Sequence, residues 1–183
     1  YISAVGALGE GSSNSLSKDT DLALAIGTKL ADFTTGSWAN FENPNFKLVS
    51  VNTARFDTTK HLATSVISDA KIGLQQISDA LGDWRAPNTW YQRAIKERDE
   101  WDAYVEKQSG PTNQEEPSYA HAVGAVYRNS DPSDIVVTAA GGLVGEVVQV
   151  WKPKQLNTFE TEWGFSCMGY EISGALGIKM AKP

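Results

Sequence analysis

Short apolar runs, each closed by a glycine or a polar turn, constrain the fold of this chain more than any other feature. The run over residues 21–27 ends at a glycine, and a second run over residues 47–52 is rich in β-branched residues. Such runs are typical of strands buried in a parallel sheet. Residues 66–67 give a third, weaker strand signal, and the segment 69–81 keeps apolar residues at helical spacing. The sequence therefore predicts an α/β fold with parallel strands.

The same alternation restarts in the last third of the chain. Residues 84–107 mix aromatic and charged side chains and predict an exposed amphipathic helix, whereas residues 110–117 hold turn formers and acids without apolar residues. This second composition is typical of a linker and marks the expected domain boundary. A helix over residues 119–128, a buried strand over 134–140 and an apolar helix over 171–181 follow.

Composition excludes several classes of protein. The chain has 183 residues, a formal net charge of −6 and 41% hydrophobic residues, which excludes disorder. The acidic balance and the lack of a Lys/Arg cluster argue against nucleic acid as a partner. No stretch approaches the ~18 apolar residues of a membrane span. We expect a cytoplasmic protein that has no membrane partner and is cut from a longer chain.

Cysteine and histidine are too scarce for most metal sites. Cys167 is the sole cysteine, so neither an internal disulfide nor a cysteine-built zinc site is available. The two histidines, His61 and His121, are expected to be surface or satisfied core residues. Any metal would have to be bound by oxygen.

Two segments could bind a ligand, and each has a plainer interpretation. Residues 141–145 form a glycine-rich turn between a strand and a helix, which could cradle a phosphate or be only a tight turn. Residues 163–170 could seat a flat ring or form a core loop. Cys167 could be a nucleophile, but a small buried hydrophobe is the commoner role. Glu160 and Glu162 could have a raised pKa for proton transfer or be solvated acids.

The residues themselves resemble a known family. The segment 161–177, with its Ser-Cys-Met-Gly-Tyr-Glu-Ile run, is similar to the thiamine-diphosphate enzymes. Together with residues 30–38 after the Ile-Gly-Thr strand end at 26–28, it more narrowly resembles the trihydroxycyclohexane-1,2-dione hydrolases of inositol catabolism. The resemblance covers essentially the entire chain.

This resemblance implies a domain organisation. Residues 1–108 correspond to the C-terminal part of a three-layer, parallel-sheet central domain, residues 109–117 to a linker, and residues 118–183 to the incomplete first part of the thiamine-diphosphate-binding α/β domain. The family's activating glutamate belongs to an N-terminal domain outside the chain. Its Gly-Asp-Gly magnesium motif is expected beyond Pro183, so the chain alone should hold no metal ligand and be inactive.

The resemblance also assigns cofactor contacts and a reaction. The backbone N–H groups of Gly142 and Leu143 would face the diphosphate, Met168 would prop the bent cofactor, and its N–H with the Ser166 carbonyl would contact the aminopyrimidine. The implied enzyme is a thiamine-diphosphate- and Mg²⁺-dependent hydrolase that cleaves a carbon–carbon bond in a cyclic polyol 1,2-diketone during myo-inositol catabolism. Dimers or tetramers are implied because the cofactor normally lies between subunits.

Two alternatives remain open at this point. An acetolactate-synthase-like carboligase would share the Met-Gly-Tyr loop, although that family has Gly-Thr before the methionine and glycine after the tyrosine, where this chain has Ser166-Cys167 and Glu171. A non-catalytic nucleotide-binding or structural α/β module is the other alternative. Against it, the glycines of residues 6–11 have the wrong spacing for a dinucleotide fingerprint.

Overall fold

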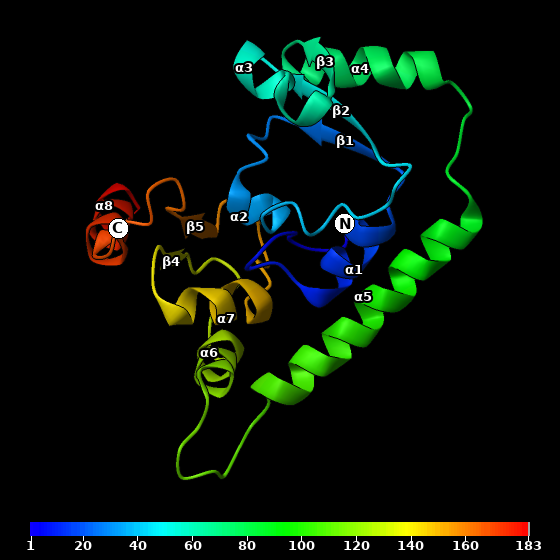
Figure 1. The fold of residues 1–183 in the computed structure, drawn as a ribbon. Coiled ribbons are helices and arrows are strands. Elements are labelled where there is room, and N and C mark those ends of the chain that lie inside the picture. The colour runs from blue at the N-terminus through cyan, green and yellow to red at the C-terminus, as the bar shows by residue number, and fades with distance from the viewer. Residues whose placement is uncertain (183) are drawn as a thin grey trace. The chain divides into compact units, whose positions relative to one another are not determined.

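The computed structural model describes residues 1–182 and shows two compact units, Tyr1–Trp101 and the part from Asp102 onward. Figure 1 follows the chain from one to the other. The division falls within the long helix α5 (Asn88–Ser109). Residues 110–117, the predicted linker, contain no helix or strand. The assignment of residues 1–108 and 118–183 to two family domains stays a prediction.

The first unit is built on a three-stranded parallel sheet. Its strands are β1 (Leu22–Ile26), β2 (Lys47–Asn52) and β3 (Thr64–Ile67), in the order β1-β2-β3. In the central strand Leu48, Ser50 and Val51 are buried, as expected for a strand paired on both edges. The α/β class with parallel strands predicted from the sequence is confirmed.

The first unit also contains short helices, a 3₁₀ turn and one longer helix. They are α1 (Gly11–Asp19), α2 (Asp32–Thr35), α3 (Arg55–Thr58), a 3₁₀ turn (Lys60–Leu62) and α4 (Ala70–Leu81). The Asp69 carboxylate caps α4 by accepting hydrogen bonds from two first-turn N–H groups. Gly73 brings α4 close to β2, because a Cβ built there would lie 2.8 Å from Cγ1 of Val51.

Helix α5 is present close to its predicted limits and begins after Pro87. In the first unit Arg93 pairs with Asp19 and with Glu97, each at 2.7 Å. The Trp101 ring lies against Gly11, where a Cβ would come within 2.6 Å of a ring carbon. The glycine at position 11 therefore lets α1 approach the indole.

The second unit repeats the strand–helix alternation on a smaller scale. It contains α6 (Tyr119–Arg128), β4 (Val136–Thr138), α7 (Gly142–Val150), β5 (Phe159–Thr161) and α8 (Tyr170–Ala181). Strands β4 and β5 are parallel. The predicted helix over 119–128 is confirmed, whereas β4 is shorter than the predicted strand over 134–140. Strand β5 was not predicted because Glu160 interrupts a segment of only three residues.

Helices α6 and α7 pack through small and β-branched side chains. Val123, Val144, Val147 and Val150 are buried, and the Tyr127 ring meets Trp151 edge-on at 5.4 Å between centroids. In contrast, α8 exposes its apolar side chains, including 79% of Ile172. Within residues 1–182, no helix combines the length and apolar character needed to cross a membrane.

Candidate functional site

Two connections leave the small parallel sheet of the second unit at the same edge. Thr138 at the end of β4 pairs with Thr161 at the end of β5, and the Glu162 N–H donates to the Thr138 carbonyl at 3.1 Å. The carboxyl ends of parallel strands are where α/β proteins place their ligands. The residues after β4 and after β5 therefore form the candidate site.

The connection after β4 is the N-terminal end of α7. Gly141 has φ +99° and precedes the helix, which begins at Gly142, so the predicted cradle is mostly the first helical turn. First-turn N–H groups have no intrahelical acceptor and carry the positive end of the helix dipole. Gly141, Gly142 and Leu143 are all exposed, so this first turn lies at the surface of the unit.

The connection after β5 folds around a carboxylate. Glu162 accepts hydrogen bonds from the N–H groups of Cys167 and Phe165, both at 2.8 Å. These donors, Cys167 first, lower the pKa of Glu162. The hypothesis that Glu162 has a raised pKa for proton transfer is therefore wrong, because backbone donors stabilise its ionised form. Glu160 instead accepts a hydrogen bond from the Tyr170 hydroxyl at 3.3 Å.

The side chains of this connection point outward. Phe165 and Met168 are 90% and 87% exposed, and Cys167 is exposed as well. The interpretations of residues 163–170 as a core loop and of Cys167 as a buried hydrophobe are therefore wrong. Ser166 has φ +52°, a left-handed conformation that non-glycine residues rarely adopt. Met168 is thus an exposed apolar side chain two residues after a turned backbone, and it could lie against a flat ligand.

Glu171, at the start of α8, joins the two connections. One carboxylate oxygen accepts from the Ala140 N–H at 3.2 Å and the other from the Gly169 N–H at 3.0 Å. The pKa of Glu171 is lowered, first by its own backbone N–H and next by that of Ala140. From the sequence alone, Glu171 serves only to distinguish this chain from the carboligases, which have glycine at that position. Its acidic side chain in the first turn of a helix was the available signal.

The predicted cofactor residues thus occupy two connected segments. Gly142 and Leu143 lie in the first turn of α7, while Ser166 and Met168 lie in the connection before α8. Leu143 is 46% exposed. Backbone N–H groups, a backbone carbonyl and an exposed methionine can hold an anionic, partly aromatic cofactor. Among residues 1–182, no group of three or more His, Cys, Asp or Glu side chains could hold a metal ion.

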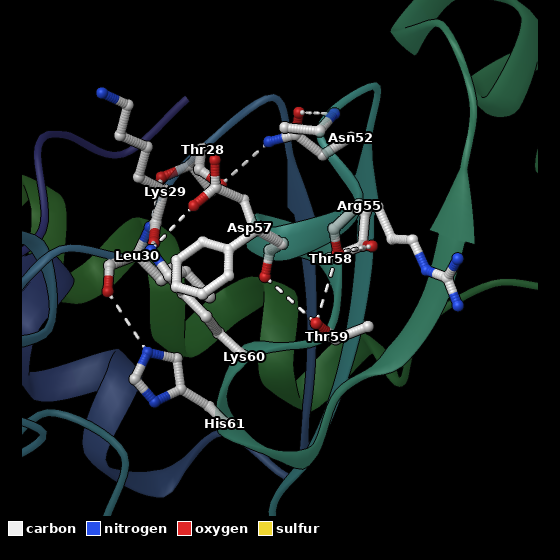
Figure 2. Close-up of polar contacts among 12 residues, drawn as sticks. Thr28, Lys29, Leu30, Asn52, Arg55, Asp57, Thr58, Thr59, Lys60 and His61 are labelled. Atoms are coloured by element: carbon white, nitrogen blue, oxygen red, sulfur yellow. Dashed lines mark hydrogen bonds and ion pairs between the residues drawn. The ribbon is translucent and has the colours of Figure 1, made fainter.

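A second polar cluster lies at the carboxyl edge of the first unit's sheet. Figure 2 shows side chains from the β2–β3 connection converging on the loop that follows β1. The carbonyls of three consecutive residues each accept a hydrogen bond: Thr28 from Asn52 at 3.2 Å, Lys29 from Lys60 at 3.2 Å, and Leu30 from His61 at 3.3 Å. Lys60 also pairs with Asp57 at 2.7 Å. The loop after β1 is therefore held along its length.

Part of the chain is similar to a known class of protein. Residues 1–77 match the family model described as thiamine pyrophosphate enzyme, central domain. The parallel α/β architecture of the first unit agrees with that match. The family resemblance predicted from the sequence is therefore confirmed.

The individual proteins that the chain resembles share one enzyme name. The chain is 33% identical to the 3D-(3,5/4)-trihydroxycyclohexane-1,2-dione hydrolase of Clostridium tetani, over 99% of this chain. It is 32% identical to the enzyme of that name in Geobacillus thermodenitrificans, over 100% of the chain, and 34% identical to the one in Listeria innocua, over 98%. In each case the chain spans 32% of the relative's length.

Proposed function

We propose that the protein containing this chain is a thiamine-diphosphate-dependent hydrolase that opens a cyclic polyol 1,2-diketone by carbon–carbon cleavage in myo-inositol catabolism. The observation that carries the proposal is that the two segments to which the resemblance assigns cofactor contacts, after β4 and before α8, meet at one sheet edge and are joined by one carboxylate. The names of the relatives support the same reaction. The chain would supply part of the cofactor site and not the whole active site.

The described residues fit this cofactor. The first-turn N–H groups of Gly142 and Leu143 would hold the diphosphate, because both residues are exposed and the helix dipole favours an anion. Met168 would support the two rings, and the N–H of Met168 with the Ser166 carbonyl would orient the aminopyrimidine. When bound, thiamine diphosphate supplies a carbanion that can add to a carbonyl carbon, while the protein orients the reacting groups.

Further parts of the proposal rest on the family resemblance alone. These are the use of Mg²⁺, a cytoplasmic location and assembly into dimers or tetramers. The resemblance assigns the magnesium ligands to a Gly-Asp-Gly motif, which the sequence does not contain.

Activity of the full-length protein tests the proposal. We expect hydrolysis of the cyclic diketone only when thiamine diphosphate and Mg²⁺ are both present. Activity that survives exhaustive removal of the cofactor would contradict the proposal, and turnover of pyruvate to acetolactate without diketone hydrolysis would replace it with the carboligase alternative. If the protein catalyses neither reaction but binds a nucleotide tightly, the binding-module alternative is favoured.

Two exposed methionines allow a matched test of the cofactor site. Met168 and Met180 are 87% and 76% exposed, so truncating either removes little packing within this chain. We expect Met168→Ala to weaken thiamine diphosphate binding about tenfold, equivalent to about 1.4 kcal/mol. Met180→Ala, twelve residues along and on α8, should leave the affinity unchanged. Calorimetric titration of both variants in the full-length protein measures the difference.

A further inference from the structure

Glu171 makes a contact that no cofactor-binding role requires of it. Its two oxygens do not share one donor group but bind N–H groups of two different connections, Ala140 after β4 and Gly169 before α8. Ala140 is two residues before Gly142, and Gly169 directly follows Met168. The carboxylate therefore spans between the segment proposed to hold the diphosphate and the segment proposed to support the rings.

Only an ionised carboxylate with this reach satisfies both donors. A carboxylate accepts hydrogen bonds at both oxygens, whereas a glutamine amide has one accepting oxygen and one donating nitrogen. A glutamine would therefore leave one of the two N–H groups facing another donor. Hydrogen bonds to a charged acceptor are also about twice as strong as neutral ones, and the N-terminal end of α8 favours a negative charge.

The same charge is unfavourable for binding an anion. Glu171 brings a negative carboxylate to the N–H of Ala140, next to the turn that would receive the diphosphate. Like charges close together repel, and the repulsion grows as water is excluded. If the site only had to bind an anion, a neutral residue at position 171 would serve better. The arrangement makes sense when the two segments must be kept at a set separation.

We propose that Glu171 is a positioning residue that holds the turn before α7 and the Met168 connection in register, so that one cofactor molecule contacts both. This inference rests on the proposed function. It predicts that removing the charge weakens the binding of one ligand and not of the other. Inorganic diphosphate needs only the turn, whereas thiamine diphosphate needs both segments.

The test is calorimetric titration of the full-length protein with each ligand in the presence of Mg²⁺. We expect Glu171→Gln to weaken thiamine diphosphate binding by about tenfold or more, the loss of one charge-assisted hydrogen bond. The affinity for inorganic diphosphate should stay the same or increase. Glu146→Gln removes an equal charge from α7 without touching the contact, and both affinities should stay at the wild-type value.

Other outcomes would overturn the inference. If Glu171→Gln lowered the affinity for both ligands equally, Glu171 would support the site only as a whole. If it left both affinities unchanged, the contact would have no role. If Glu171→Gln fails to fold, Glu171→Asp provides the test. It keeps the charge, but its side chain is one methylene too short to span both donors. It should lower the affinity for thiamine diphosphate and leave that for inorganic diphosphate unchanged. Failure of the wild-type protein to bind thiamine diphosphate would instead remove the proposed function itself.

Discussion

Trp38 and His61 stack face to face, with ring centroids 3.9 Å apart and planes inclined by 20°. Both residues have a positive φ, +69° for Trp38 and +55° for His61. Backbones of this kind are strained in non-glycine residues and persist where surrounding contacts hold them. The stack and the hydrogen bond from His61 to the Leu30 carbonyl are such contacts. His61, expected to be an ordinary surface or satisfied histidine, lies in the 3₁₀ turn at the end of the β2–β3 connection and makes both contacts there.

Two substitutions of His61 distinguish the contribution of the ring stack to stability from the cost of the positive φ. We expect His61→Ala to lower the free energy of unfolding by about 1 kcal/mol, because it removes the ring pair and keeps the unfavourable φ. His61→Gly also loses the ring pair but relieves the strain, so it should be more stable than His61→Ala by about 1 kcal/mol. Urea denaturation of both variants gives the two values. A glycine variant less stable than the alanine variant would show that the strain is unimportant.

The ion pair of Lys60 and Asp57 should contribute more than an ordinary surface pair. Their side chains are only 27% and 15% exposed, and Lys60 also donates to the Lys29 carbonyl. We expect Lys60→Met to destabilise the protein by about 1–2 kcal/mol, since it leaves a carboxylate and a carbonyl without their donor.

Lys96 and Glu100 provide the matched comparison for that pair. They lie 3.7 Å apart with side chains 72% and 66% exposed, so Lys96→Met should change stability by less than about 0.5 kcal/mol. Double-mutant cycles with Asp57→Asn and Glu100→Gln measure each coupling energy. Similar couplings for the two pairs would contradict the prediction.

Two helical glycines should respond to alanine in opposite directions. In α4 a Cβ at Gly73 would come within 2.8 Å of Val51, so Gly73→Ala should overpack this contact and destabilise by about 1–3 kcal/mol. At Gly177 in α8 a Cβ would meet nothing within 4 Å. Gly177→Ala should therefore stabilise by about 0.5–1 kcal/mol through helix propensity. Thermal melting compares them, and equal shifts in Tm would show that the Val51 contact relaxes without cost.

The connection after β5 should loosen in acid. The N–H donors of Cys167 and Phe165 lower the pKa of Glu162 below its ordinary value of 4.5. Because the folded-state pKa is the lower one, the stabilisation is complete above that ordinary value and is lost as pH falls through the lowered pKa. Hydrogen exchange of Phe165 and Cys167, corrected for the intrinsic rate at each pH, should show this loss. Glu162→Gln should be fast at every pH, and a pH-dependent profile in that variant would contradict the assignment.

Local periodicity explains why much of the fold could be predicted. The runs at 21–27 and 47–52 and the helical spacing of 70–81 and 119–128 are properties of adjacent residues, and each became the expected element. Four-residue helices such as α2 carry too few residues for a period. Their formation depends on neighbours that the local pattern does not contain.

The candidate site could be predicted only in part. The glycine-rich pattern and the family resemblance both point to Gly142, whereas Met168 rests on the resemblance, and their cofactor contacts remain predictions. The Glu171 contact with Ala140 joins residues 31 positions apart in sequence, and the pKa of Glu162 depends on how its own loop turns back. Both depend on three-dimensional proximity, which no composition or spacing rule specifies.

The three anchored carbonyls after β1 have a consequence for proteolysis. A protease must draw an exposed segment into an extended conformation, and around residues 28–30 that would break the hydrogen bonds from Asn52, Lys60 and His61 together. Residues 110–117 lie in a segment without helix or strand and are rich in proline and exposed acids. Limited digestion should therefore cut there first and spare the loop after β1, even though both lie on the surface.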